Sequence, residues 1–394
     1  MADPFGVLGA HPVARSVSAK LLLGAERLRR PSLPVRGQLP PPLAPAGSDH
    51  LVTVAIPNYN YGRYLAQAVA SAVRQEGVRV EVVIVDDCST DDSYEIAQKL
   101  QADHAEVTAL RNDTNSGPGI TFNRAWQAGA GQFVVRLDAD DILTPGCLAR
   151  AVAVMEAFPE VGLVYGRVQH FEGDTPPAPV EAPAHAVVWS GHDWAYRAIQ
   201  DDRNLISTPE AMLRRSVMER HGAWKPELVH SQDFEMWLRA ATFSDVGYLA
   251  GPAQALKRYH VTSLGQSEGS VGTRPFVEHL AAYDSWYRDV ADQFPAADRY
   301  YSLGRRGLAQ RAVRHALHSY RRGVADHEAV TTLGTMASEL APDLPRLATL
   351  SRYARATQRF GPRAVRMSPP ALWGSACERL RLAGVQAGLE RDGY

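Results

Sequence analysis

The stretch LVTVAIPNYN, residues 51–60, decides the fold class of this chain. Leu51–Ile56 form a continuous apolar, β-branched run, as expected of a strand buried on both faces of a sheet. Apolar residues at helical spacing follow from Tyr64, and a second buried strand is expected at Val82–Val85. Because the interval between the two runs suits a helical crossover, we predict a βαβ unit with parallel strands.

The alternation of strand and helix continues beyond this unit. Further strands are expected at Val107–Leu110, Gln132–Leu137 and Val161–Tyr165, with helices between them. This rhythm predicts an α/β domain with a mainly parallel, Rossmann-like sheet. From the Pro-rich stretch Thr175–Pro183 to about Gln266 the pattern becomes mixed α+β.

The chain is long enough for more than one domain, because 394 residues exceed an ordinary single core. Residues 1–48 are expected to be a disordered tail, since Pro31–Pro45 is rich in prolines, which cannot donate to a sheet. Residues 49–272 form the predicted catalytic domain. Residues 273–394 are rich in Ala, Leu and Arg and are expected to form a helical C-terminal domain. Its helices should break at Pro342–Pro345, Pro362 and Pro369–Pro370.

Composition argues against several classes of protein. Lys and Arg (42) nearly balance Asp and Glu (43), so charge gives no reason to expect a nucleic-acid partner. The three cysteines are too few and too widely spaced for a disulfide framework, which favours a reducing compartment. We expect a cytoplasmic protein, because the sequence shows neither a membrane-spanning apolar run nor a secretion signal. Arginine clusters leave a peripheral membrane contact open.

Acidic residues follow two predicted strands at the point where each strand ends. Asp86-Asp87 comes after the second strand, and Asp138-Ala139-Asp140-Asp141 comes after the fourth. Ligands of open parallel sheets bind beyond the carboxyl ends of the strands, so these carboxylates should converge on one rim. Packing alone has no use for such a cluster, since each ionised carboxylate must stay hydrated or be paired.

A hard divalent cation that bridges to phosphate accounts for this cluster. Mg²⁺ and Mn²⁺ prefer oxygen ligands and are commonly held by one or two carboxylates together with substrate phosphates. A lone Asp-X-Asp is frequent in loops, but Asp138-Ala139-Asp140 follows a buried strand and is accompanied by a second Asp pair. The chain lacks GxxxxGK[ST], and GxGxxG does not follow the first strand, which argues against a P-loop and a dinucleotide site.

Several segments together resemble the inverting family 2 of GT-A-fold glycosyltransferases. They are VAIPNYN (54–60), VIVDDCSTDD (83–92), RLDADD (136–141), SQDFEMWLR (231–239) and RYH (258–260) followed by Ser263 and Ser267. The segments occur in the family's order and at its spacing, but they cover neither the N-terminal tail nor the C-terminal helical region. The resemblance implies the GT-A fold and a nucleotide-sugar donor.

The resemblance also implies roles for the residues that bind the donor. Pro57 and Tyr59 would line the pocket of the nucleotide base, with Tyr59 stacking on it. Asp87 would accept a hydrogen bond from a uracil-type base, and Asp138 would lie near the ribose and the donor sugar.

The metal and the base are implied in the same way. Asp140 and His260 would be ligands of a Mn²⁺ or Mg²⁺ ion that holds the diphosphate. Asp233 would be the general base. Gln232 stands where the family more usually has Glu, which leaves Asp233 as the clear candidate. Acceptor contacts are expected near Thr208–Glu210.

Each of these roles has a structural alternative. Tyr59 could be an aromatic at the rim without a ligand, and Asp86 is better explained as a cap of the turn that follows it. Asp141 is either a cap or a sugar contact. Taken without their motif, Asp233 and Glu235 would be solvated charges on a helix.

We therefore expect an inverting glycosyltransferase that moves a hexosyl or N-acetylhexosaminyl group from a nucleoside-diphosphate sugar, with UDP favoured, to an acceptor hydroxyl. One base without a nucleophile implies a single displacement. The sequence leaves open whether the acceptor is a sugar, a lipid-linked intermediate or a small molecule, and it leaves the oligomeric state open. One alternative is a catalytically degenerate scaffold, and another is a nucleotidyltransferase, for which the loop after the first strand lacks basic residues before Arg63.

Overall fold

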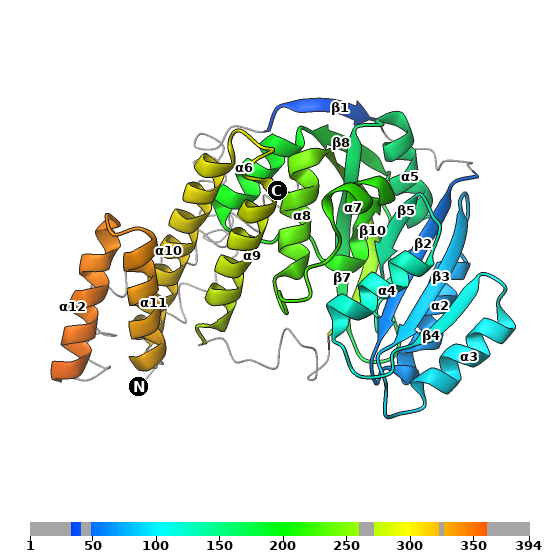
Figure 1. Cartoon of the computed structure of the whole chain (residues 1–394), viewed down its shortest axis with the longest axis horizontal. Helices are drawn as coiled ribbons and strands as arrows, with labels where there is room; N and C mark the ends of the chain where they lie inside the picture. The colour runs from blue at the N-terminus through cyan, green and yellow to red at the C-terminus, as the bar shows by residue number, and fades with distance from the viewer. Residues whose placement is uncertain (1–32, 41–48, 260–271, 323–326, 361–394) are drawn as a thin grey trace, which may run out of the picture. The chain divides into compact units, whose positions relative to one another are not determined.

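The computed structural model of the chain describes residues 33–40, 49–259, 272–322 and 327–360 (Figure 1). The chain divides into two compact units, Pro34–Leu308 and the remainder. The first unit contains the sheet. In the second, the structure describes helical segments from Ala309 onward.

One mixed sheet organises the first unit. Its strands are hydrogen-bonded in the order β1-β8-β10-β7-β9-β5-β2-β3-β4, and β6 pairs with β10. The strands are β1 (Val35–Leu39), β2 (Leu51–Asn58), β3 (Arg79–Asp86), β4 (Val107–Arg111), β5 (Phe133–Arg136), β6 (Ile142–Leu143), β7 (Val161–Glu172), β8 (His185–Trp189), β9 (Met212–Arg214) and β10 (Asp245–Tyr259). Strands β5, β2, β3 and β4 are parallel, which confirms the predicted α/β core. Strand β9 runs antiparallel between β5 and β7.

Helices connect the strands of the sheet and continue the chain after β10. They are α2 (Gly62–Val73), α3 (Ser93–Asp103), α4 (Pro118–Ala128), α5 (Cys147–Ala157), α6 (Gly191–Asp201), the short 3-10 helix η1 (Thr208–Glu210), α7 (Arg215–His221), α8 (Gln232–Phe243), α9 (Arg274–Val290), α10 (Ala297–Arg322), α11 (His327–Leu340) and α12 (Pro345–Phe360). Val54 and Ile56 of β2 share one core with apolar residues of α2 and α5. Thr53 points to the other face, where its hydroxyl accepts a hydrogen bond from Gly131 N after α4.

The expectation of a disordered tail is wrong at Val35–Leu39. These residues form β1, which pairs antiparallel with β8 at one edge of the sheet. The segment VRGQL lies between Pro34 and Pro40 and contains no proline, so each of its residues retains a backbone N–H for the ladder. The other residues of the expected tail, apart from those next to β1 and β2, lie outside the described part of the chain.

The domain boundary expected at residue 272 also differs from the structure. Helix α9 and the first part of α10, to Leu308, belong to the same compact unit as the sheet. The Tyr283 hydroxyl donates to Asp202 Oδ1 at 3.0 Å, and Trp286 Nε1 donates to Thr242 Oγ1 at 3.0 Å. Both aromatic side chains are fully buried, so α9 completes the core beside α8.

The described part of the C-terminal region is helical, as predicted. Helix α11 ends at Leu340 and α12 begins at Pro345, which confirms the break expected at Pro342–Pro345. The breaks expected at Pro362 and Pro369–Pro370 lie outside the described residues. Across the described segments, none of the helices has the length and apolar character needed to cross a bilayer.

Candidate active site

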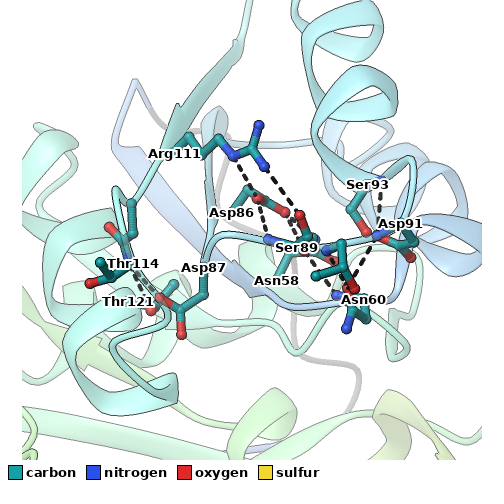
Figure 2. A network of polar contacts seen from close by, with 12 residues as sticks. Asn58, Asn60, Asp86, Asp87, Ser89, Asp91, Ser93, Arg111, Thr114 and Thr121 are labelled. Carbon is teal, nitrogen blue, oxygen red and sulfur yellow. Dashed lines mark hydrogen bonds and ion pairs between the residues drawn. The ribbon is translucent and has the colours of Figure 1, made fainter.

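Asp86, the last residue of β3, joins the loops that follow β2 and β3 (Figure 2). Its fully buried carboxylate accepts hydrogen bonds from Asn58 Nδ2 (3.0 Å), the Ser89 hydroxyl (2.5 Å) and the Ser89 backbone N–H (2.9 Å). Arg111 Nε lies 3.5 Å from Asp86 Oδ2. The structural alternative is thus confirmed for Asp86, which caps the turn.

Asn60 also connects the loops that follow β2 and β3 by hydrogen bonds (Figure 2). Its backbone N–H donates to the Ser89 hydroxyl at 2.9 Å, and its side-chain oxygen accepts from Thr90 N at 2.8 Å. The residue has a φ of 59°, a left-handed conformation that Asn tolerates better than most residues. Tyr59 is thereby presented at the rim with 41% of its surface exposed.

Asp87 reaches in the opposite direction, toward the start of α4 (Figure 2). Its Oδ1 accepts from Asn112 Nδ2 (2.7 Å) and Ser116 N (2.8 Å), and its Oδ2 accepts from Gly117 N (2.8 Å). Gly117 has a φ of 85°, which glycine adopts without strain. A carboxylate has about four lone-pair sites, so Asp87 retains capacity for one further donor.

The Asp138–Asp141 turn follows β5. Asp138 Oδ1 accepts from Arg136 Nε at 2.9 Å, and the Asp138 side chain remains partly exposed. Asp141 is buried, and its Oδ1 accepts from the Arg258 backbone N–H at 2.9 Å. Burial, together with the neighbouring Asp140 and Asp138, raises the pKa of Asp141 well above its usual range. Asp141 therefore fixes β10 against this turn.

Asp233 lies in the first turn of α8, where the helix dipole favours a carboxylate. Its Oδ2 accepts from Asn204 Nδ2 at 2.8 Å and its Oδ1 accepts from Phe234 N at 2.8 Å. Burial raises the pKa of Asp233, while these hydrogen bonds and the charges of Arg136 and Lys257 oppose the rise.

Glu235, two residues further along α8, has a different environment. Its carboxylate forms a two-point ion pair with Arg239, with Nε–Oε1 and Nη2–Oε2 distances of 2.8 Å. Both side chains are fully buried. Arg239 also donates to the His221 and Ala223 carbonyls. Glu235 is thus a structural residue and not a solvated charge.

The structure contains a cleft of about 790 Å³ beside the loops that follow β2, β3 and β5. Six of the seven predicted site residues line it: Pro57, Tyr59, Asp87, Asp138, Asp140 and Asp233. The seventh, His260, lies outside the described residues. A second cavity, of about 450 Å³, is lined by none of the predicted site residues.

Two side chains that the sequence analysis assigned no role also belong to this cleft. Lys257, in β10, is half-buried and lies within electrostatic range of Asp138, Asp141 and Asp233. Gln232 is 6% exposed, and its Oε1 has no hydrogen-bond partner among the described residues. The sequence signal was that Lys257 directly precedes the RYH segment and that Gln232 stands within the SQDFEMWLR segment.

The segment expected to contact the acceptor is divided between cleft and core. Thr208 lines the cleft. Glu210 is 7% exposed, its Oε1 accepts from Ser207 N at 3.0 Å, and burial raises its pKa to about 8. Trp194 and Trp224 are buried core residues.

The acidic side chains present fit a hard divalent cation. Asp138 and Asp140 offer oxygen atoms at the cleft, which are the ligands that Mg²⁺ and Mn²⁺ prefer. Within the described ranges, no group of three or more His, Cys, Asp or Glu side chains is arranged to hold a metal by itself. An ion at this position would therefore need further ligands, such as substrate phosphates.

Comparison with known proteins identifies the family. The model of glycosyl transferase family 2 matches residues 53–222, which include most of β2, the Asp138–Asp141 turn and η1. The match identifies a family 2 glycosyltransferase region at residues 53–222. An uncharacterized glycosyltransferase of Nostoc sp. is 39% identical to this chain over 114 residues, which are 29% of the chain and 35% of that protein. The chain thus spans about a third of that relative's length.

Two further similarities extend over more of the chain. The putative colanic acid biosynthesis glycosyl transferase WcaA of Escherichia coli is 24% identical over 258 residues, which cover 65% of the chain and 87% of that protein. The crystal structure of S. aureus TarS 1–349 in complex with UDP-GlcNAc matches with a TM-score of 0.57 at 19% identity. It covers 80% of this chain and 90% of that one. The fold is therefore the GT-A fold predicted from the sequence.

Proposed function

We propose that this family 2 glycosyltransferase transfers a sugar from a nucleoside-diphosphate sugar, with UDP as the favoured nucleotide, to an acceptor hydroxyl with inversion. One observation carries the proposal. Asp233, from α8, lines the same cleft as Asp87, Asp138 and Asp140, which follow the carboxyl ends of β3 and β5. A carboxylate suited to act as a base thus shares one cleft with carboxylates suited to a nucleotide and a cation.

The donor half of the cleft suits a nucleotide. Tyr59 is exposed at the rim and offers a ring on which a base can stack. Asp87, an acceptor with capacity for one more donor, suits the N–H of a uracil-type base. Asp138 suits a ribose or sugar hydroxyl. The similar TarS structure contains UDP-GlcNAc, which supports a UDP-sugar as the first donor to test.

Among the residues that the structure describes, Asp140 is the proposed metal ligand. His260 is proposed as a second ligand. When bound, Mn²⁺ or Mg²⁺ would neutralise negative charge that develops on the departing diphosphate.

Asp233 is the proposed general base. An attacking hydroxyl must lose its proton as the new bond forms, and a carboxylate at hydrogen-bond distance can accept it. Because the cleft offers this base and we assign no residue as a nucleophile, the proposal is a single displacement, which inverts the anomeric carbon. The sugar proposed to be transferred is a hexosyl or N-acetylhexosaminyl group.

Thermal unfolding with a donor panel tests the binding half of the proposal. UDP, UDP-GlcNAc, UDP-glucose and GDP-mannose are each added with and without Mn²⁺. We expect a metal-dependent rise in Tm with at least one UDP compound, and loss of that rise in Asp140→Ala. Asp103→Ala is the matched control, because Asp103 is an exposed residue at the end of α3. A panel without any response contradicts the proposal.

Donor hydrolysis tests the catalytic half. Release of UDP from the donor that binds should be detectable in the wild type and should fall at least about a hundredfold in Asp233→Asn, since general base catalysis typically contributes 10²–10⁴-fold. Binding without turnover would favour a degenerate scaffold. Release of pyrophosphate from a nucleoside triphosphate would favour a nucleotidyltransferase.

A further inference from the structure

Arg258, in β10, contacts the Asp138–Asp141 turn through both its side chain and its backbone. The residue lines the cleft but is only 2% exposed. Its Nε donates to the backbone carbonyl of Asp140 at 3.1 Å, and its backbone N–H donates to Asp141 Oδ1 at 2.9 Å. One residue of β10 thus holds two consecutive residues of the turn, and the first of these is the proposed metal ligand.

Two aromatic rings pack against the guanidinium of Arg258. Its central carbon lies 4.3 Å from the ring centroid of Tyr64, in α2, and 4.5 Å from that of Phe171, in β7. Both aromatic side chains are buried. A guanidinium over an aromatic face is attracted by the ring, and the attraction is stronger where water is excluded. The rings therefore stabilise the buried cation at this place.

Hydrogen bonds also fix the orientation of the Arg258 guanidinium. Nη2 donates to Gln67 Oε1 at 2.8 Å, and Nη1 donates to the Gly173 carbonyl. With Nε on the Asp140 carbonyl, each of the three nitrogens has an acceptor, and the acceptors come from α2, from the segment after β7 and from the turn. Because a guanidinium is planar and its N–H groups point in fixed directions, these bonds together determine its position.

We propose that Arg258 is a positioning residue for the metal site, which holds the Asp138–Asp141 turn in the conformation that presents the Asp140 carboxylate to the ion. The inference rests on the proposed role of Asp140 as a metal ligand. It goes further in assigning the support of that ligand to a residue that contacts its backbone and not the ion. Groups that orient metal ligands in this way commonly matter for affinity nearly as much as the ligands do.

A direct role of Arg258 in binding the donor diphosphate is less consistent with its contacts. All three guanidinium nitrogens already donate to protein oxygen atoms, and the residue has almost no exposed surface. A phosphate could take full advantage of the guanidinium fork only if some of these bonds were broken.

The first test measures the turn without any ligand. The Asp141 N–H donates to the Asp138 carbonyl at 3.0 Å, so its hydrogen exchange reports opening of the turn. We expect Arg258→Lys to speed this exchange by about tenfold or more, because a lysine ammonium cannot reproduce the planar fork and its hydrogen bonds. Arg63→Lys is the matched control, because Arg63 is exposed and lies over the Tyr64 ring at 4.4 Å but forms no hydrogen bond with the turn.

Gln67→Met decides the question if Arg258→Lys does not fold. Gln67 is exposed and supplies the acceptor of Nη2, so its substitution leaves the buried cation in place. Exchange of the Asp141 N–H should accelerate by a smaller factor than in Arg258→Lys, while the amides of α3 exchange at wild-type rates. An unchanged Asp141 exchange rate in folded Arg258→Lys, or in Gln67→Met where the former does not fold, overturns the inference.

The second test measures Mn²⁺ binding in the presence of UDP, from the electron paramagnetic resonance signal of the free ion. We expect the Kd for Mn²⁺ to rise about ten- to a hundredfold in both Arg258→Lys and Arg258→Met, as is typical when the support of a metal ligand is removed. Arg220→Lys is the control, since Arg220 is exposed in α7 and does not line the cleft. Wild-type affinity in Arg258→Lys with a loss in Arg258→Met would show that only the charge matters, as in a contact with the diphosphate, and would overturn the inference.

Failure of the proposed function would give a different result. A wild-type protein that binds no Mn²⁺ with any nucleotide of the donor panel contradicts the proposed function, and with it the metal role of Arg258. Mn²⁺ binding that is lost in Asp140→Ala but unchanged in folded Arg258→Lys overturns the inference alone. The two failures are thus distinguishable.

Discussion

Asn204 Nδ2 donates a 2.8 Å hydrogen bond to Oδ2 of Asp233, so the proposed base has an amide partner from the loop after α6. Asn204 is itself oriented, because its Oδ1 accepts from Ile206 N at 3.3 Å. A donor aimed at a carboxylate favours the ionised form. Asn204 and Lys257 therefore act on Asp233 in the same direction, one by contact and the other by charge.

Asn204→Ala should make Asp233 a less effective base at low pH, while the side chains that line the cleft stay in place. Burial already raises the pKa of Asp233, and loss of the amide donor raises it further, so the acidic limb of kcat/KM should move to higher pH. On that acidic limb we expect roughly a tenfold loss, because a hydrogen bond to a charged group contributes about 1.5 kcal/mol or more. A pH-rate profile of donor hydrolysis checks this, with Asn115→Ala as an amide control in the same cleft. A parallel loss at all pH values would contradict it.

Glu210 should make the protein less stable as pH rises. Its pKa in the folded protein is raised to about 8, against an ordinary value of 4.5, because it is buried. Between these pH values the folded state holds the proton that the unfolded state has lost, so the free energy of unfolding falls with rising pH. Glu210→Gln keeps the acceptor for Ser207 N and removes this dependence.

Urea unfolding at pH 5.5 and pH 8 measures the effect. Relative to the wild type, Glu210→Gln should gain on the order of a few kcal/mol at pH 8 and much less at pH 5.5. Glu76→Gln is the control, since Glu76 is an exposed residue after α2. An equal difference at both pH values would show that Glu210 does not titrate in this range.

The sequence predicted the elements whose character is local. Strands β2 and β3 are buried on both faces, so each contains a run of mostly apolar residues that can be recognised in the sequence alone. The grouping of the carboxylates that follow β3 and β5 is expected from the rule that ligands bind beyond the carboxyl ends of parallel strands. For this reason Asp87, Asp138 and Asp140 were found, and the structure places them along one cleft.

The elements that were missed depend on long-range pairing. Strand β9 has three residues, and it is a strand because β5 and β7 lie on either side of it. Lys257 is of a residue type that usually lies at exposed positions, but it pairs with His170 of β7 in the sheet and lines the cleft. Asn204 belongs to a loop without periodicity. Neither Lys257 nor Asn204 could be assigned from a local pattern.

Asp86 and Asp87 are adjacent in sequence, but substitutions at the two positions should have different effects, on stability at Asp86 and on nucleotide binding at Asp87. Asp86→Ala leaves Asn58 and Ser89 without their common acceptor and removes the carboxylate that faces Arg111. We expect a loss of about 3 kcal/mol in the free energy of unfolding, as is typical when one partner of a buried charged network is removed. Urea unfolding measures it, and the exposed Asp113→Ala is the control. Asp87→Asn should instead reduce the rise in Tm with UDP.

Glu235 and Asp233 provide the last comparison, because both stand in the first turn of α8 and only one is proposed to act in catalysis. Glu235→Gln leaves the fully buried Arg239 without its compensating charge, so we expect a loss of about 3 kcal/mol in stability. The exposed Glu227→Gln should change stability by less than about 0.5 kcal/mol, as surface substitutions usually do.

Asp233→Asn should show the opposite pattern. Burial raises the pKa of Asp233, so its ionised form is disfavoured in the folded protein, and a neutral amide at this position should leave the stability unchanged or higher at neutral pH. Donor hydrolysis should nevertheless be lost, because an amide cannot accept the proton. Unfolding curves and hydrolysis rates measured on the same preparations separate the two residues. If Glu235→Gln kept full stability and lost only activity, Glu235 and not Asp233 would have to be considered as the base.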